Sequence, residues 1–212
     1  MVPWLRNLGK EFLQTLYLRD KFLWRIPAGL PNAIGLTFDD GPDPLHTPAI
    51  LELLSRHDVK ATFFLVGCNV ERYPHLAHEI IAQGHALGGH THNHRTIVKL
   101  PRHELVDELE RCRRAIQNAT GVDTDLFRPP KGEMDFVSAR LVAQLGYKLV
   151  HWSKTYSDYK CDGTKYLLQR INDNPVRNRD ILLFHDTNPY TVEALSGVIP
   201  KWRNCGFSFY HL

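Results

Sequence analysis

Short apolar runs rich in β-branched and aromatic residues alternate along the chain with longer segments whose apolar residues recur at helical spacing. The runs predict strands at residues 34–38, 61–66, 86–89, 125–128, 148–152, 181–184 and 207–210. The intervening segments predict a helix that Thr47 caps, with Pro48 in its first position, and further helices at residues 71–83, 101–119, 136–145, 164–172 and 192–202. This alternation predicts a parallel sheet with right-handed crossovers, either an open doubly wound sheet or a barrel.

Ionisable residues gather where the predicted strands end. They are Asp39 and Asp40 after the first strand, His90 and His94 after the third, Arg128 at the end of the fourth, Asp158 beyond the fifth and His185 after the sixth. The carboxyl ends of all strands in a closed parallel barrel meet at one mouth, whereas an open sheet brings together only the strands at its switch point. We therefore predict an incomplete or distorted α/β barrel.

The N-terminal residues 1–32 form a predicted amphipathic helical segment ahead of a single domain at residues 33–212. Apolar residues recur in it near helical spacing, at Trp4, Leu5, Leu8, Phe12, Leu16 and Trp24. Two interpretations stay open: a helix that covers one side of the core, or a helix that makes peripheral contact with a membrane or a partner. Cationic residues interrupt its apolar run, so we expect neither a secretory signal nor a membrane span, and a cytoplasmic location, with membrane association as the alternative.

Composition narrows the class of protein. The chain has 212 residues, 43% of them apolar and 23% charged, as in a soluble globular domain. A net charge of +3, from 26 Lys and Arg against 23 Asp and Glu, gives no sign of a nucleic-acid partner. Four cysteines lie far apart in the sequence, which favours reduced thiols over a zinc ribbon or a disulfide scaffold.

Two motifs carry candidate chemistry. Asp39 and Asp40 are adjacent carboxylates at a strand end, so their side chains point in different directions and can serve different tasks. His90 and His94 are four residues apart, and on a helical turn both would face one cation, with His92 turned toward solvent or behind the site. Together with Asp40 they form a three-ligand set that leaves positions open for water and substrate. The alternative for each motif is a polar loop without function.

Four segments in this order resemble the motifs of the polysaccharide deacetylase family, carbohydrate esterase family 4 with its NodB homology domain. The segments are Thr37–Gly41, His90-Thr91-x-x-His94, Arg128-Pro129-Pro130 and Leu183-Phe184-His185. The family includes chitin, peptidoglycan and chitooligosaccharide deacetylases, and the resemblance spans residues 33–212. It implies a distorted, incomplete (β/α)7 barrel, in agreement with the alternation of strands and helices.

The resemblance also implies roles for the motif residues around a metal. Asp40, His90 and His94 would hold a divalent metal, with zinc expected and cobalt, nickel or manganese as alternatives. Thr91 would brace the histidine loop, and Leu183 would line the pocket for the acetyl group.

The same resemblance implies the catalytic groups. Asp39 would be the general base, Arg128 would pair with Asp39 and orient it, and His185 would be the general acid that protonates the leaving amine. The backbone N–H of Lys131 would stabilise the oxyanion.

Two positions depart from the family pattern. Lys131 stands where the family usually has an aromatic residue, which suggests either a substrate with an anionic group or a solvent-exposed lysine. In the fourth motif Thr155 replaces an aspartate and Tyr159 replaces a tryptophan of the groove, while Asp158 is kept and would orient His185.

The expected activity is metal-dependent removal of acetyl groups from an N-acetylated sugar or oligosaccharide. An O-acetyl esterase, another linear amidase and a catalytically silent glycan-binding module are the alternatives. A lipid-linked carbohydrate is one candidate substrate. The sequence predicts no oligomeric state.

Overall fold

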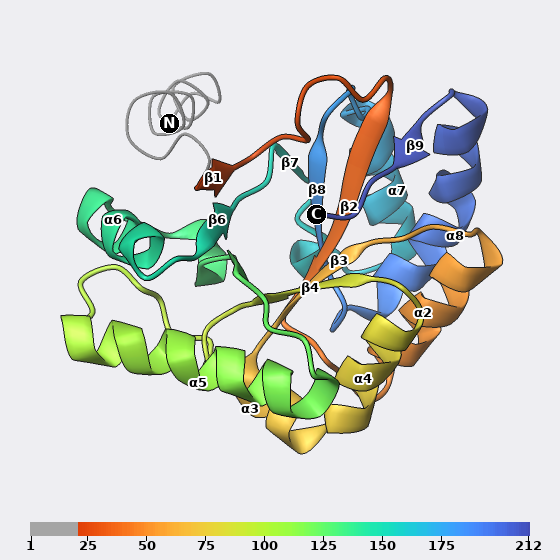
Figure 1. Ribbon diagram of the computed structural model, residues 1–212. Coiled ribbons are helices and arrows are strands. Elements are labelled where there is room, and N and C mark those ends of the chain that lie inside the picture. Colours follow the sequence, from red (N-terminus) through yellow and green to blue (C-terminus); the bar gives the residue numbers. More distant parts are fainter. Residues whose placement is uncertain (1–20) are drawn as a thin grey trace.

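The computed structural model describes residues 21–212, in which nine strands form one sheet in the order β1-β6-β5-β4-β3-β2-β8-β7, with β9 pairing beside β2. The strands are β1 (Phe22–Leu23), β2 (Ala33–Asp39), β3 (Thr62–Leu65), β4 (Ala86–Gly89), β5 (Leu126–Phe127), β6 (Lys148–Val150), β7 (Lys154–Thr155), β8 (Ile181–His185) and β9 (Ser208–Phe209). The pairings between these strands are parallel. The sheet curls, with the helices on its outer side (Figure 1).

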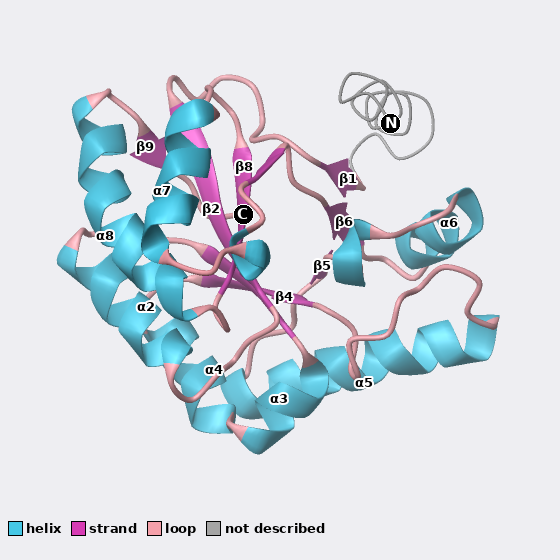
Figure 2. Cartoon of the chain, turned by 180° about the vertical axis from the view of Figure 1, so that it is seen from behind, coloured by secondary structure: helices cyan, strands magenta, loops and turns pink. Residues whose placement is uncertain are grey.

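The helices cover the sheet from outside, as the view from behind also shows (Figure 2), and they connect successive strands except β1 to β2 and β6 to β7. They are α2 (His46–Arg56), α3 (Gly67–Arg72), α4 (Pro74–Ala82), α5 (Arg102–Thr120), α6 (Phe136–Gln144), α7 (Thr164–Asp173) and α8 (Pro189–Asn204), with short 3-10 turns η2 (Pro130–Gly132) and η3 (Asp158–Lys160). The predicted incomplete barrel is confirmed. Parallel strands separated by helices produce it, because each helix returns the chain to the same end of the sheet.

Strand β2 lies at the centre of the structure and is buried along its whole length. It pairs with β3 on one side and with β8 on the other, and its last residue, Asp39, stands opposite Phe64 and His185. Apolar side chains of these strands pack against α2, α4, α5 and α8 in one large core cluster. This packing fixes the strand register, and the register brings the carboxyl ends of β2 and β8 side by side.

The prediction of a helical segment at residues 1–32 is wrong for residues 21–32, the part of it that the structure describes. Residues 22 and 23 form strand β1, which pairs with β6, and Phe22 and Trp24 join a core cluster with α5 and α6. Positions 1–20 of the prediction, including its membrane contact, lie outside the described residues. Among residues 21–212, none of the helices is both long and apolar enough to cross a membrane.

Two helix predictions also differ from the structure. The predicted helix at residues 71–83 is two helices, because Pro74 cannot continue α3 and instead begins α4. Thr47 does not cap α2 and Pro48 is not its first residue, because α2 begins at His46, two residues before Pro48. The Thr47 hydroxyl is used in contacts with Asp43 and Asp186 instead.

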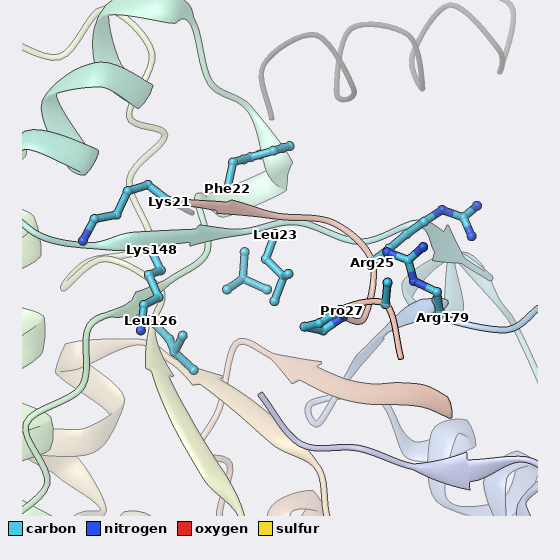
Figure 3. Close-up of a pocket in the computed structure, with 10 residues that line it drawn as sticks. Lys21, Phe22, Leu23, Arg25, Pro27, Leu126, Lys148 and Arg179 are labelled. Atoms are coloured by element: carbon cyan, nitrogen blue, oxygen red, sulfur yellow. The ribbon is translucent and has the colours of Figure 1, made fainter. Parts of the chain in front are cut away.

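A cavity of about 360 Å³ lies at the amino ends of β5 and β6, away from the ionisable residues at the carboxyl ends (Figure 3). Four cationic side chains line it, and each has a partner in the protein. The atom pairs are Lys148 Nζ–Asp125 Oδ2 at 2.9 Å, Lys21 Nζ–Gly146 O at 3.2 Å, Arg179 Nε–Ile26 O at 2.7 Å and Arg25 Nη1–Asp180 Oδ1 at 3.6 Å. Two of these cations are thus paired with carboxylates and the other two with backbone carbonyls.

Candidate metal centre and active site

The turn after β2 carries the two adjacent carboxylates. Asp39 is the last residue of β2 and is 3% exposed, while Asp40 has a left-handed backbone with φ 79°. A left-handed non-glycine residue is uncommon and marks a functional or strained position. The two carboxylates nevertheless approach the same imidazole, because Asp39 Oδ2 lies 3.9 Å and Asp40 Oδ1 lies 3.4 Å from His90 Nε2. The alternation of a strand, on which the prediction of different directions was based, ends at Asp39.

Asp40, His90 and His94 converge on one point. Asp40 Oδ1 lies 3.4 Å from His90 Nε2 and 3.1 Å from His94 Nε2, and the three candidate ligand atoms lie within 4.8 Å of one another. Asp40 Oδ1 is buried without a well-formed hydrogen bond among residues 21–212. A buried carboxylate oxygen without a hydrogen-bond partner and the two imidazole nitrogens near it are a set of ligand atoms that suits a divalent metal such as zinc. The residues present therefore fit a metal.

The backbone holds this set in place. The carbonyl of Arg128 lies 2.7 Å from His90 Nδ1, which leaves Nε2 of the ring for a metal. The Thr91 hydroxyl donates to the carbonyl of His90 at 2.7 Å. Burial alone would raise the pKa of Asp40, but the two neighbouring imidazoles hold that pKa well below its usual range.

The histidine loop is not helical, in contrast to the prediction for His90 and His94. Thr91 and His94 have positive φ values of 60° and 54°, and the loop brings the two rings together by these turns. His92 points away from the site, as predicted, but it is 1% exposed rather than in solvent. Its Nε2 lies 2.8 Å from Arg111 Nη2 on α5.

Arg128 lies fully buried beneath Asp39. Its Nη1 donates to Asp39 Oδ1 at 2.6 Å and to the Thr37 hydroxyl at 2.7 Å, and its guanidinium lies 4.1 Å from the ring centre of Phe64. Burial lowers the pKa of Arg128, and the charge of Asp39 opposes that shift. The predicted pairing of Arg128 with Asp39 is present. The hydrogen bond between Arg128 and Thr37 was not predicted.

His185 at the end of β8 pairs with Asp158 of η3. Asp158 Oδ1 lies 2.8 Å from His185 Nδ1, and Asp158 Oδ2 accepts from the His185 backbone N–H and from the Thr191 hydroxyl. Burial alone would lower the pKa of His185, but the bond to Asp158 and the nearby carboxylates raise it to about 9. The imidazole is therefore protonated at neutral pH, with Nε2 left free of Asp158.

These groups line one cavity of about 530 Å³ at the carboxyl ends of the strands. Its walls include the predicted Leu183, Lys131 and Tyr159, and also four residues that were not predicted as lining: Glu133, Trp152, Thr155 and Thr187. Leu183 is buried, whereas Lys131 and Tyr159 are exposed at the rim. A strand-end position could have indicated Thr187, beyond β8, and Trp152, the last residue of the strand predicted at 148–152, but Glu133 comes from a loop whose path the sequence pattern does not predict.

Comparison with known proteins identifies the family to which the chain belongs. The polysaccharide deacetylase family model matches residues 26–150. The chain belongs to the polysaccharide deacetylase family. Family members similar to it include a peptidoglycan-N-acetylglucosamine deacetylase of Bacillus cereus, which is 31% identical over 207 residues and aligned over 95% of this chain and 94% of its own length.

Other members of the polysaccharide deacetylase family differ in length or activity. The peptidoglycan-N-acetylglucosamine deacetylase PgdA of Listeria monocytogenes is 32% identical over 83% of this chain, which spans only 37% of the length of that protein. The Bc1960 peptidoglycan N-acetylglucosamine deacetylase matches with a TM-score of 0.86 and 28% identity, over 95% and 94% of the two chains. A Bacillus anthracis protein described as a CE4 family pseudoenzyme matches with a TM-score of 0.83 and 28% identity, over 91% of this chain and 68% of its own.

The predicted family and barrel are thus confirmed for this polysaccharide deacetylase family member. Family membership alone does not establish activity, because the fold also occurs in a pseudoenzyme. The roles of the individual residues stay predictions.

Proposed function

We propose that the protein is a metal-dependent hydrolase that removes acetyl groups from an N-acetylated sugar or oligosaccharide. The observation that carries the proposal is that one cavity holds a candidate metal set, a buried carboxylate paired with an arginine, and a histidine paired with a buried aspartate. The deacetylases that the chain resembles are named for N-acetylglucosamine of peptidoglycan, which supports an N-acetylated sugar as the substrate class.

Asp40, His90 and His94 would hold the metal. A divalent cation there supplies positive charge that polarises an acetyl carbonyl and makes a water molecule more acidic. Zinc suits two nitrogens and one carboxylate oxygen, with cobalt, nickel and manganese as alternatives.

Asp39 is suited to act as the general base. Its Oδ1 is bound by Arg128, and its Oδ2 lies 3.9 Å from His90 Nε2, on the side of the candidate metal set. Asp39 Oδ2 can therefore take a proton from a water molecule held near Asp40 and the two histidines. Arg128 keeps the carboxylate in one orientation during this transfer.

His185 is suited to act as the general acid. Amide cleavage requires a proton on the leaving nitrogen, since an amide anion leaves poorly. Asp158 holds Nδ1 of the ring, so Nε2 can donate its proton toward the cavity. Water thus adds to the acetyl carbon, the C–N bond breaks, and acetate and a free amine result. Leu183 would contact the acetyl methyl group, and the Lys131 N–H would donate to the developing oxyanion.

The test is acetate release from N-acetylglucosamine oligomers by the full chain, before chelation, after chelation and after zinc is restored. We expect activity that disappears with the chelator and returns with zinc. Asp39→Asn should abolish it, whereas Asp125→Asn, which removes a surface carboxylate at the other end of the strands, should not. Acetate release that survives complete metal removal would overturn the proposal.

Release of acetate from O-acetylated but not from N-acetylated sugars would identify an esterase instead. Glycan binding without any acetate release would identify a silent binding module, the state suggested by the pseudoenzyme of this fold.

A further inference from the structure

Asp186 follows His185 directly and takes no part in the proposed reaction. Its side chain is fully buried, and it lies beneath the turn that carries Asp39 and Asp40. We propose that Asp186 is a positioning residue that holds this turn in place. It thereby determines the metal affinity of the site and the position of the base Asp39. The inference rests on the proposed function, since it concerns the metal ligand Asp40 and the base Asp39.

The closest packing is between the Asp186 carboxyl group and Gly41. A Cβ atom added to Gly41 would lie 2.0 Å from Asp186 Oδ2 and 2.6 Å from its Cγ, far inside normal contact. The carboxyl group therefore rests directly on the backbone of residue 41, and only glycine fits there. Because Asp40 is the preceding residue, a shift of this contact moves the metal ligand.

Hydrogen bonds tie both ends of the turn to Asp186, one to its backbone and the other, through Thr47, to its carboxyl group. At one end, the Asp186 backbone N–H donates to the carbonyl of Asp39 at 3.3 Å. At the other end, the Thr47 hydroxyl accepts from the Asp43 backbone N–H at 2.8 Å and donates to Asp186 Oδ2 at 2.6 Å. The segment from Asp39 to Asp43 is thus tied to the end of β8 through Asp186 and Thr47.

The position is costly for a carboxyl group, which argues for a specific task. Burial, together with the charges of Asp40 and Asp43, raises the pKa of Asp186 to about 7, although the bond from Thr47 opposes this shift. Asp186 Oδ1 has no hydrogen-bond partner within residues 21–212. An apolar side chain would avoid these costs but could not accept from Thr47. The hydrogen bond that the carboxyl group accepts from Thr47 holds the turn in one position.

A role in folding alone is the competing explanation, and β8 offers a matched control. Asp180 stands immediately before this strand, as Asp186 stands immediately after it. Asp180 is 1% exposed, and its carboxylate accepts from the Ser153 hydroxyl at 2.7 Å and from the backbone N–H of Arg177 at 2.8 Å. It lies at the opposite strand end from the candidate metal centre, so its loss should lower stability without changing metal affinity.

The experiment is a zinc titration of the metal-free full chain against a competing chromophoric chelator. Asp186→Ala should weaken zinc binding by about 10- to 100-fold, the range for groups that orient metal ligands. Asp186→Asn keeps an oxygen for Thr47 in the same volume and should retain most of the affinity. Asp180→Ala should bind zinc like the wild type. Wild-type affinity in Asp186→Ala, or an equal loss in Asp180→Ala, would overturn the inference.

Thr47 variants provide a second route should Asp186→Ala fail to fold. Thr47→Val removes the hydroxyl at nearly constant size and should weaken zinc binding, whereas Thr47→Ser keeps the hydroxyl and should not. In acetate-release assays saturated with zinc, Asp186→Ala should lower kcat with little change in KM, because the base is displaced and the sugar contacts are not. Equal zinc affinity in Thr47→Val and Thr47→Ser would contradict the inference.

The two proposals fail in different ways. A wild-type chain that binds no zinc would refute the proposed function, and this inference with it. A wild-type chain that binds zinc and releases acetate, with Asp186→Ala equal to it in both assays, would refute only the positioning role.

Discussion

Replacing Asp158 by Asn should convert the protonated His185 into a neutral imidazole. The backbone N–H of His185 and the Thr191 hydroxyl both donate to Asp158 Oδ2, so the oxygen of the asparagine amide will occupy that side. The NH₂ group is then left facing His185 Nδ1, at the position where Oδ1 now lies 2.8 Å away. A donor there stabilises the neutral ring, and the negative charge that favours the imidazolium is lost.

The size of the effect follows from the pKa of His185, which is raised to about 9. An unperturbed histidine has a pKa of about 6.5, and the difference corresponds to about 3 kcal/mol. At pH 8 the wild-type ring is about 90% protonated, whereas a ring at the unperturbed value is about 3% protonated, a loss of about 30-fold in the acid form. Since the pKa is raised on folding, the stabilisation by this pair is complete below about pH 6.5 and is lost as pH rises through about 9.

The assay is an NMR titration of the imidazole resonances in the metal-free protein, with His185→Gln to assign them. Asp162→Asn, which removes an exposed carboxylate four residues along the chain, is the control and should leave the His185 pKa unchanged. Acetate release at pH 8 should fall in Asp158→Asn and recover partly toward pH 6. A His185 that still titrates near pH 9 in Asp158→Asn would refute the reasoning, as would a wild-type His185 that titrates near 6.5.

Four further outcomes test other parts of the structure. Arg128→Met leaves the buried Asp39 unpaired and should lower the free energy of unfolding by about 3–5 kcal/mol in denaturant titrations; an unchanged midpoint would contradict the pairing. His94→Ala should weaken zinc binding in the chelator competition while leaving Tm nearly unchanged, because its side chain is 39% exposed. Lys131→Tyr should reduce acetate release from anionic acetylated sugars more than from neutral ones, and equal effects would exclude an anionic substrate. Phe22→Ala should cost about 3–5 kcal/mol of stability if β1 belongs to the domain, and a smaller loss in calorimetry would count against it.

The strand-end positions of the polar residues could be predicted without coordinates. A strand has a period of two and a helix a period of 3.6, so the apolar pattern reveals where β2, β4 and β8 end. Parallel connections return each strand to the same end of the sheet, so Asp39, His90 and His185 were expected to meet. The short strand β1 was missed because its apolar residues fit the helical spacing assigned to residues 1–32, and β7 was missed because Lys154 and Thr155 form no apolar run.

Other features depend on contacts between distant segments. The four-residue spacing of His90 and His94 indicated the right pair but the wrong local structure, because the loop reaches this geometry through positive φ values rather than a helical turn. The order β3-β2-β8 brings Asp186 beneath Gly41 and close to Thr47, although 139 residues separate Asp186 from Thr47. Local patterns thus identify the chemical groups and the ends of the strands that carry them. Which carboxyl group becomes a metal ligand, a base or a buried support depends on burial and on partners that only the packed sheet brings together.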